Sequence, residues 1–472
     1  MMSLQQALPW LDNARLVGEG AVGFQRVHTD TRTIEPGDLF VALRGERFDA
    51  NDFLVEAKAK GAVAAICQGD DAATRLQAAG LPGLVVADAK LALAALATGW
   101  RAQFQLPLIA VTGSNGKTTV TQMIAAILLA FKPQAFLATQ GNLNNDIGVP
   151  LTVLRLRRHH DIAVVELGMN HPGEIATLAA IAQPTVALVN NAQREHLEFM
   201  ETVQAVAQEN GSVIDALPAH GVAVFPSDDL YSTLWAAKAG SRAAQQFCVS
   251  DDVASPAQVR CTQALWSGDA WHVTAATPAG TLTYALHIAG LHNVKNSLAA
   301  IACTQAAGVP LDAIARGLAA FVPVKGRSRA LVVQHGARTI TVVDDTYNAN
   351  PDSVQAAIHV LAALPGPRLL VLGDMGEVGD QGPQFHAEAG QLARALGIEA
   401  LFTLGELSVA ASESFGAGRH FADSPSIQAA VLAQLPEVGS VLVKGSRFMK
   451  MERVVEAMTA PVQQDKGMNH VV

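Results

Sequence analysis

The segment AVTGSNGKTTVTQM, residues 110–123, contains the residue types of a phosphate-binding loop. It follows an apolar run and precedes a helix-like stretch, so Gly113 and Gly116 lie where a strand turns into a helix. Backbone N–H groups and a helix N-terminus at such a junction bind phosphate oxygens. Lys117 can add positive charge beside the terminal phosphates, and Thr118 can hold a magnesium ion. The predicted nucleotide-binding residues are Thr112, Gly113, Ser114, Asn115, Gly116, Lys117, Thr118 and Thr119.

The loop departs from the usual nucleotide-binding pattern, in which the first glycine stands five residues before the second. Val111 occupies that position here, and Gly113 is the first glycine of the loop. A glycine-rich turn with an incidental lysine is the alternative interpretation. The apolar run before the loop and the Lys-Thr-Thr sequence within it favour nucleotide binding.

Two further polar residues follow predicted strands, and both are candidates for a metal site. Glu166 lies at the end of the apolar run DIAVVELG, and His196 stands just past the next run, PTVALVNN. The carboxyl ends of parallel strands meet at the edge of the sheet where ligands bind. Glu166 can there complete the magnesium shell that Thr118 begins; the alternative is a buried glutamate paired with a structural base. His196 is either a ligand on the same edge, two strands from the loop, or a structural histidine.

Amide and charged side chains mark other candidate binding sites. TQGNLNNDIGVP, residues 139–150, is rich in amides, which recognise sugars and peptide groups, although an asparagine-rich turn has the same composition. DDTYNANP and VKGSR each end a predicted strand. Asp345 can accept a hydrogen bond from a ribose hydroxyl, and Lys444 with Arg447 can hold a carboxylate or a phosphate. GDMGEVG has the wrong spacing for a dinucleotide fingerprint.

The elements that must position these residues fall into three parts, so the predicted fold class is α/β with three domains. Residues 1–102 form a small α/β domain. Residues 103–322 alternate near-continuous apolar runs with helices, as in a mostly parallel sheet covered on both faces, with an antiparallel patch between 245 and 290. Residues 323–472 form a doubly wound, Rossmann-like domain. Strands are predicted at 38–43, 62–67, 83–88, 108–113, 161–168, 184–191 and 221–226.

Composition limits the class of protein. With 472 residues, half of them hydrophobic, the chain is long enough for two to four domains. A net charge of −9, with acidic and basic residues intermixed, argues against nucleic acid or an anionic membrane as a partner. The four cysteines are scattered, the start lacks the pattern of a secretory signal, and the most apolar segment is too short to span a bilayer. We expect a reduced, cytoplasmic protein and, without a legible apolar stripe, a monomer.

Taken together, the motifs resemble those of the Mur ligase family, the ATP-dependent amide-forming enzymes of peptidoglycan precursor synthesis. They occur in the order TGSNGKTT, VVELGMN, EHLE, LHNVKNSLAA, VKGRS, DDTYNANP, GDMGEVG and VKGSR, and they cover almost the whole chain. Such an ordered set is far more specific than any one motif. DTRTIEPGDLFVALRGERFDANDF, GNLNNDIGVP and DDTYNANPDS are most similar to the members that add D-alanyl-D-alanine to a UDP-N-acetylmuramoyl tripeptide.

The resemblance implies a role for each part of the chain. The first domain is expected to hold the UDP-sugar end of the substrate, the second to bind ATP and Mg²⁺, and the third to close on ATP and the dipeptide. The implied catalytic residues are Lys117, Glu166, His196 and Arg327. Asn293 and Asn296 are expected to face adenine, Asp345 the ribose and Arg327 the phosphates. The implied substrate-binding residues are Thr31, Arg47 and Phe48 for UDP, Thr139, Asn142, Asn144 and Asn145 for the muramoyl group, and Tyr347, Asn348, Lys444, Ser446 and Arg447 for the peptide and dipeptide.

The reaction that the resemblance implies passes through an acyl phosphate, which the amine of the dipeptide then attacks. Other interpretations stay open: a related ligase that adds the third residue, or a ligase like folylpolyglutamate synthase, which shares the loop type and the reaction. The latter is expected to lack the amide-rich segment. A P-loop regulatory ATPase that ligates nothing belongs to a different class, and it leaves the polar clusters of the third part unexplained.

One departure from the family concerns the metal site. Many relatives carry, after the HLE histidine, a carbamylated lysine that serves as a carboxylate-like ligand of a second magnesium ion. No lysine occurs here between Lys132 and Lys238, and the matching position is Asn210, preceded by Glu209. We favour Glu209 because its carboxylate is permanently charged, over the neutral oxygen of Asn210 or a solvated helix residue without a ligand role. The predicted metal ligands are thus Thr118, Glu166, His196 and Glu209.

Overall fold

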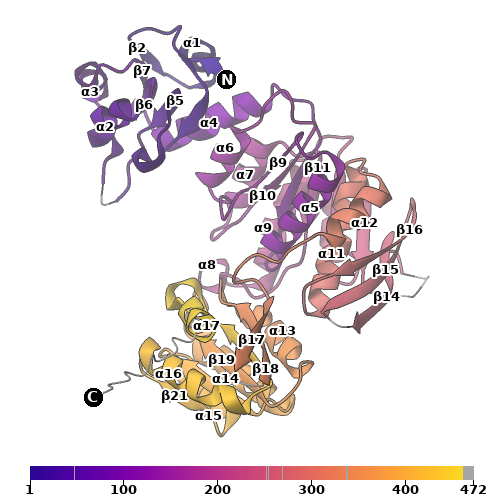
Figure 1. Ribbon diagram of the computed structural model, residues 1–472. Coiled ribbons are helices and arrows are strands. Elements are labelled where there is room, and N and C mark those ends of the chain that lie inside the picture. Colours follow the sequence, from indigo (N-terminus) through magenta and orange to yellow (C-terminus); the bar gives the residue numbers. More distant parts are fainter. Residues whose placement is uncertain (47, 251, 253–254, 268, 336–337, 461–472) are drawn as a thin grey trace, which may run out of the picture.

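The structure is a computed structural model, and it describes residues 1–46, 48–250, 252, 255–267, 269–335 and 338–460. Three lobes follow one another along the chain, each built around its own sheet (Figure 1). The mixed α/β fold with three mostly parallel sheets confirms the predicted fold class. Within the residues that the structure describes, no helix is both long and apolar enough to cross a membrane.

The N-terminal lobe has a five-stranded sheet in the order β2-β7-β6-β5-β4, in which only β2 runs antiparallel to its neighbour. The three strands predicted in this part, at 38–43, 62–67 and 83–88, are confirmed as β5, β6 and β7. Helix α4 links the lobe to the centre, because its apolar face packs against α6 and α7 of the central lobe. The elements are β1 (Met2–Ser3), α1 (Leu4–Ala7), β2 (Arg15–Val17), β3 (Gly23–Phe24), β4 (Arg26–His28), β5 (Asp38–Val41), α2 (Leu54–Ala59), β6 (Ala64–Gln68), α3 (Ala72–Ala79), β7 (Gly83–Val86) and α4 (Ala89–Arg101).

The central lobe has a nine-stranded sheet in the order β16-β15-β14-β13-β12-β11-β8-β10-β9. From β9 across the sheet to β14, including β8, each strand is parallel to its neighbours. Strands β14, β15 and β16 pair antiparallel and form the predicted antiparallel patch. Both faces of the sheet are covered, which explains the continuous apolar runs. In β8, for example, Leu108 and Ala110 point into one core while Ile109 and Val111 point into the other.

The helices of this lobe lie on either side of the sheet. Helices α5, α11 and α12 pack on one face, and α6, α7, α9 and α10 lie on the other. The strands are β8 (Leu108–Thr112), β9 (Phe136–Ala138), β10 (Ile162–Glu166), β11 (Val186–Val189), β12 (Val222–Pro226), β13 (Ala243–Cys248), β14 (Val259–Ser267), β15 (Ala270–Thr277) and β16 (Gly280–Leu286). The helices are α5 (Lys117–Phe131), α6 (Gly148–Val153), α7 (Glu174–Ala182), α8 (Leu197–Met200), α9 (Val203–Asp215), α10 (Ser232–Ala239), α11 (Leu291–Ala306) and α12 (Leu311–Ala319).

The C-terminal lobe has a six-stranded sheet in the order β17-β18-β22-β19-β20-β21, parallel except for β17. Helices α13, α14 and α15 cover one face, and α16 and α17 cover the other, as in a doubly wound domain. The elements are β17 (Arg329–His335), β18 (Arg338–Asp345), α13 (Pro351–Ala362), β19 (Arg368–Gly373), α14 (Gly382–Ala395), β20 (Ala400–Leu404), α15 (Val409–Phe415), β21 (Arg419–Phe421), α16 (Ser424–Gln434), β22 (Ser440–Lys444) and α17 (Glu452–Thr459).

Candidate functional site

A cavity of about 1280 Å³ lies where the central and C-terminal lobes meet, and α4 of the N-terminal lobe borders it. Its wall contains the predicted loop from Ser114 to Thr119, together with Glu166 and His196. From the C-terminal lobe it contains Arg327 and Asp345. The carboxyl ends of β8, β10, β18 and β22 therefore open into one space, as the sheet-edge argument predicts.

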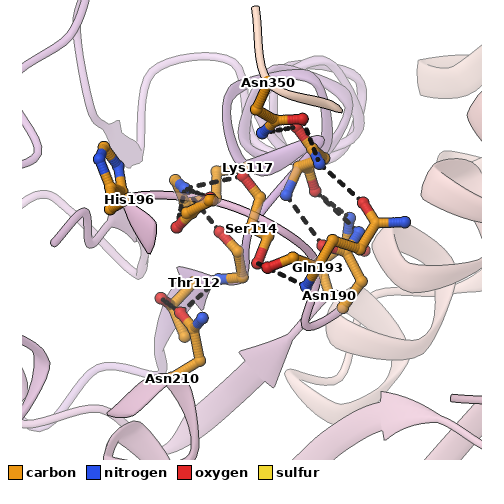
Figure 2. A network of polar contacts seen from close by, with 12 residues as sticks. Thr112, Ser114, Lys117, Asn190, Gln193, His196, Asn210 and Asn350 are labelled. Atoms are coloured by element: carbon orange, nitrogen blue, oxygen red, sulfur yellow. Dashed lines mark hydrogen bonds and ion pairs between the residues drawn. The ribbon is translucent and has the colours of Figure 1, made fainter. Parts of the chain in front are cut away.

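The predicted phosphate loop joins β8 to α5 in a tight turn. Gly113 and Gly116 have φ values of 128° and 82°, which favour glycine. A Cβ atom at Gly116 would lie 2.6 Å from Oδ1 of Asn296, so a larger residue would have to displace that side chain. Asn210 fixes the start of the loop, because its Oδ1 accepts hydrogen bonds from the Thr112 hydroxyl at 2.6 Å and from the Gly113 N–H at 2.9 Å (Figure 2).

Lys117 lies over the loop that carries it. Its Nζ donates to the carbonyl oxygens of Gly113 at 2.6 Å and Ser114 at 3.1 Å. Both carboxylate oxygens of Glu195 lie 3.3 Å from the same Nζ. Burial raises the pKa of Glu195, and the Lys117 ammonium opposes that shift. The sequence analysis assigned no role to Glu195; its place directly before His196, after an apolar strand, was the signal that could have found it.

Glu166 stands at the end of β10 beside the loop. Its Oε1 accepts hydrogen bonds from the Thr118 hydroxyl at 3.1 Å and from Nδ2 of Asn144 at 2.8 Å. Its backbone N–H donates to Oγ1 of Thr139 at 2.9 Å. Its other oxygen, Oε2, is buried and has no hydrogen-bond partner among the described residues. A carboxylate oxygen without a partner beside a threonine hydroxyl has the chemistry that magnesium prefers.

His196 follows β11, and β11 is the direct neighbour of β8 in the sheet. His196 follows the second strand predicted after the loop, but in the sheet it is one strand away, because β8 lies between β10 and β11 although it precedes both in the sequence. His196 lines the cavity, and its Nδ1 lies 2.6 Å from Oε2 of Glu377 in the C-terminal lobe. The contact with His196 lowers the pKa of Glu377.

Glu209 does not face the loop, which corrects the expectation that it completes the metal site. Its two oxygens accept hydrogen bonds from the N–H groups of Gly173 at 2.9 Å and Ile175 at 2.8 Å, at the N-terminus of α7. Consecutive residues of a helix point about 100° apart. Asn210 therefore reaches the loop, while Glu209 on the same turn of α9 reaches the neighbouring helix.

The two predicted adenine residues of α11 belong to a chain of amides. Nδ2 of Asn296 donates to Oδ1 of Asn293 at 3.0 Å, and Nδ2 of Asn190 donates to Oδ1 of Asn296 at 2.9 Å. Asn190 also donates to the backbone oxygen of Asn115 in the loop at 2.8 Å (Figure 2). Asn293 and Asn296 both line the cavity, and Asn296 supports the loop through Asn190.

In the C-terminal lobe the structure pairs two residues for which the sequence analysis expected separate roles. Nζ of Lys444 lies 2.6 Å from Oδ2 of Asp345 and also donates to the backbone oxygen of Asn348 at 3.0 Å. The guanidinium of Arg327 lies over the Tyr347 ring, 4.0 Å from its centroid. All five residues line the cavity.

The remaining predicted residues divide between the cavity wall and other parts of the molecule. Asn142 and Asn145 line the cavity. Ser446 is buried, and its Oγ accepts from the Gly376 N–H and donates to the Ala349 oxygen. Arg447 is exposed beside Tyr347. Among the cavity residues that the structure describes, neither Ser446 nor Arg447 is found, and the same holds for the two UDP candidates Thr31 and Phe48. The third UDP candidate, Arg47, lies outside the described residues.

Polar contacts join the central and C-terminal lobes beside the phosphate loop. Asn115 of the loop and Asn350, which caps α13, exchange side-chain hydrogen bonds at 2.9 and 3.3 Å (Figure 2). Arg194 binds Asp352 through its backbone N–H at 2.7 Å and its Nη2 at 2.9 Å, and its Nη1 donates to Glu388 at 3.0 Å. Sequence reasoning missed these residues because no local pattern indicates a contact between domains.

Comparisons with known proteins agree with this arrangement. The family model described as "Mur ligase family, catalytic domain" matches residues 24–101, "Mur ligase middle domain" matches 111–304, and "Mur ligase, glutamate ligase domain" matches 328–447.

Two curated relatives carry the name UDP-N-acetylmuramoyl-tripeptide--D-alanyl-D-alanine ligase. The protein of Escherichia coli (strain K12) is 41% identical over 434 residues, which are 92% of this chain and 93% of that protein. The protein of Haemophilus influenzae is 37% identical over 453 residues, 94% of this chain and 96% of that protein.

Solved structures show the same fold. A crystal structure of MurF from Acinetobacter baumannii superposes with a TM-score of 0.87 and 33% identity, covering 97% of this chain and 98% of that one. MurF ligase from Thermotoga maritima in complex with ADP has a TM-score of 0.77 at 26% identity, covering 92% and 97%. A folylpolyglutamate synthase of Mycobacterium tuberculosis shares the fold at 16% identity, with a TM-score of 0.62 over 79% of this chain and 95% of that one.

Proposed function

Since this chain belongs to the Mur ligase family, we infer that it joins D-alanyl-D-alanine to UDP-N-acetylmuramoyl-tripeptide with the energy of ATP, in peptidoglycan precursor synthesis. The relatives that match more than nine-tenths of the chain are named for this ligation. One observation in the structure carries the inference. A single cavity brings together a phosphate loop, a carboxylate oxygen without a partner among the described residues, and the polar residues that end β18 and β22.

We propose a division of labour among three domains. Residues 1–102 hold the UDP-sugar end of the substrate, residues 103–322 bind ATP, and residues 323–472 close on ATP and the dipeptide. The three separate sheets support this division. So does the position of the cavity, which central and C-terminal residues line and which α4 of the first domain borders. We expect the protein to act as a monomer in the cytoplasm.

ATP binds, in this proposal, with its phosphates on the loop from Thr112 to Thr119. Asn293 and Asn296 face the adenine, and Asp345 accepts a hydrogen bond from the ribose. Arg327 adds positive charge beside the phosphates, and its position over the Tyr347 ring holds the guanidinium at the cavity wall. Lys444 supports Asp345 through their 2.6 Å ion pair, so it acts on the nucleotide through that carboxylate.

Magnesium fits the residues beside the loop. The Thr118 hydroxyl and Oε2 of Glu166, which no described residue contacts by a hydrogen bond, would hold one ion, and His196 would contribute to a second. When bound, magnesium supplies positive charge that offsets the charge of the transferring phosphoryl group. Asn144 orients the Glu166 carboxylate through its 2.8 Å hydrogen bond. Thr139 does so through the Glu166 backbone.

The remaining chemistry is positioning and charge stabilisation by this chain. The carboxylate of the tripeptide attacks the γ-phosphorus of ATP, ADP leaves, and an acyl phosphate forms. The amine of D-alanyl-D-alanine attacks the acyl carbon, loses a proton, and the carbon–oxygen bond to phosphate breaks. Lys117 and Arg327 stabilise the negative charge in both steps, and the cavity between the domains holds the reactants next to each other.

We propose substrate contacts on the cavity wall and outside it. Asn142 and Asn145, beside α4, lie where the muramoyl group passes from the first domain to the centre. Tyr347 and Asn348 lie on the C-terminal side, where the dipeptide enters. Ser446 supports that side through its contacts with Gly376 and Ala349. Thr31, Arg47 and Phe48 bind the UDP, and Arg447 contacts the incoming dipeptide from the rim.

The experiment that tests the function is a phosphate-release assay with each combination of substrates. We expect release to require ATP, magnesium, the UDP-muramoyl tripeptide and the dipeptide together. Lys117→Ala is expected to lower the rate at least about 100-fold while UDP-substrate binding persists. Phosphate release without either substrate would instead indicate a regulatory ATPase. Activity with a folate and glutamate would indicate the folylpolyglutamate synthase reaction.

A further inference from the structure

Glu377 of the GDMGEVG segment faces His196 across the junction of the central and C-terminal lobes. Its Oε2 lies 2.6 Å from Nδ1 of His196, and both residues line the cavity. Among the described residues Nδ1 makes no hydrogen bond of regular geometry. At 2.6 Å, however, a carboxylate oxygen and a lone pair on Nδ1 would repel each other, so Nδ1 carries the hydrogen in this contact. In the neutral imidazole Nε2 is then the nitrogen with a free lone pair. The contact thus determines which ring nitrogen a ligand can reach.

Both residues are held in a backbone conformation that side chains rarely adopt. His196 has φ of 50° and Glu377 has φ of 58°, and neither is a glycine. Residues in this region persist only where the surrounding structure fixes them, and they gather at functional sites. Here two such residues contact each other across a domain junction, so the surrounding structure holds the backbone of both partners in place.

The loop that carries Glu377 is anchored on both sides of the junction. Within its own lobe, the N–H of Met375 donates to Nε2 of His386 at 2.9 Å, and the N–H of Gly376 donates to Oγ of Ser446 at 2.7 Å. Across the junction, the N–H of Glu198 donates to the backbone oxygen of Glu377 at 3.4 Å. The backbone on either side of the carboxylate is therefore fixed while the lobes are together.

We propose that Glu377 is a positioning residue that prepares His196 for magnesium, and that it does so only while the C-terminal domain is docked. The inference rests on the proposed function, in which His196 is a metal ligand. Carboxylates that accept from the far nitrogen of a metal-binding imidazole fix its tautomer and raise its basicity. The imidazole and its carboxylate come from different domains, so closure itself completes the histidine half of the metal site.

The test uses the full-length chain with a non-hydrolysable ATP analogue and Mn²⁺ as the probe ion. Mn²⁺ affinity is measured by electron paramagnetic resonance, and the His196 tautomer by ¹⁵N nuclear magnetic resonance. Glu377→Ala is expected to weaken Mn²⁺ binding about 10-fold or more and to release the Nδ1–H tautomer into a mixture. Glu377→Gln retains an acceptor oxygen, so it is expected to keep the tautomer and to lose less affinity. The glutamine variant also provides the test if the alanine variant fails to fold.

Glu388→Ala is the matched control. Glu388 accepts from Arg194 at 3.0 Å across the same junction, and Arg194 keeps its ion pair with Asp352 when Glu388 is removed, so the domains stay docked and His196 is not touched. We expect this variant to keep both the tautomer and the Mn²⁺ affinity of the closed complex. Equal effects of Glu377→Ala and Glu388→Ala, or an unchanged tautomer in Glu377→Ala, would overturn the proposal. Unchanged Mn²⁺ binding in His196→Ala would instead refute the assignment of His196 as a metal ligand. The tautomer measurement does not depend on that assignment, so the two failures can be told apart.

Discussion

The ammonium of Lys117 lies 3.3 Å from each carboxylate oxygen of Glu195, and Glu195 is only 4% exposed. The loop itself supplies two further acceptors to the same ammonium. A negative group therefore stands beside the place where the phosphates of ATP must bind. When ATP binds, the Lys117 ammonium must exchange its contact with Glu195 for a contact with a phosphate.

Replacing Glu195 tests this competition. We expect Glu195→Gln to bind ADP about fivefold more tightly in the absence of metal, because ~1 kcal/mol of repulsion is removed and Lys117 is released. The turnover rate is expected to fall, since Lys117 loses the group that orients it. Isothermal titration with ADP and a steady-state assay measure the two effects. Glu198→Gln removes an equal charge from an exposed position, and we expect it to change neither the ADP affinity nor the turnover rate.

The neighbours Glu209 and Asn210 are expected to respond to mutation in different ways. Glu209→Gln removes a charge from the N-terminus of α7, so it should lower the unfolding temperature by a few degrees, from a loss of about 1–2 kcal/mol. Its magnesium requirement should match that of the wild type. Asn210→Ala removes the acceptor of the Gly113 N–H, and it should weaken ADP binding roughly 10-fold. A raised magnesium requirement in Glu209→Gln would contradict the geometry.

The sequence was sufficient for the long apolar strands of the fold and insufficient for their order in the sheet. Runs such as LIAVTG and DIAVVELG predict strands because both faces of the sheet are covered, so each run is apolar throughout. Such strands look alike, and nothing in their residues places β8 between β10 and β11. Strand β13, AAQQFC, was missed because part of it is polar and only its last two residues are buried.

The same contrast holds within the site. Glu166 and Thr118 were predictable because each ends or begins an element at the same edge of the sheet. Glu209 was misplaced because a single step along a helix changes the face of the residue, and the composition of α9 does not determine its phase to one residue. Glu377 and Asn350 stand in the motifs GDMGEVG and DDTYNANP, but nothing in these motifs indicates their partners, since the contacts form only when two domains meet.

Arg194 is expected to control how firmly the domains stay together. Arg194→Ala removes its ion pairs with Asp352 and Glu388, so the nucleotide-free enzyme should open, with a larger radius of gyration in small-angle scattering. KM for the dipeptide should rise, because the third domain carries its site in our proposal. Lys132→Ala breaks an exposed pair within the central lobe and should leave both quantities unchanged. Equal scattering from Arg194→Ala and the wild type would rule out this role.

Acid is expected to weaken the anchor of the Glu377 loop through His386. Burial lowers the pKa of His386, whose Nε2 accepts from the Met375 N–H. The unfolded chain binds a proton below about pH 6.5 while the folded chain resists it, so this contribution is complete above that pH and is lost as pH falls toward the folded pKa. The slope is at most ~1.36 kcal/mol per pH unit. Unfolding temperatures measured from pH 7.5 to 5 should fall less steeply in His386→Gln, and exposed His220→Gln should keep the wild-type slope.

The paired amides of Asn115 and Asn350 also bear on how this enzyme is best inhibited. One belongs to the phosphate loop and the other to the cap of α13, so both are within reach of a small molecule only when the domains are together. A compound that bridged them would select the closed form, and its apparent dissociation constant would be the intrinsic one divided by the fraction of closed molecules. Its potency would therefore rise with the concentration of any substrate that favours closure, whereas a compound that competes only at the loop would lose potency as ATP accumulates.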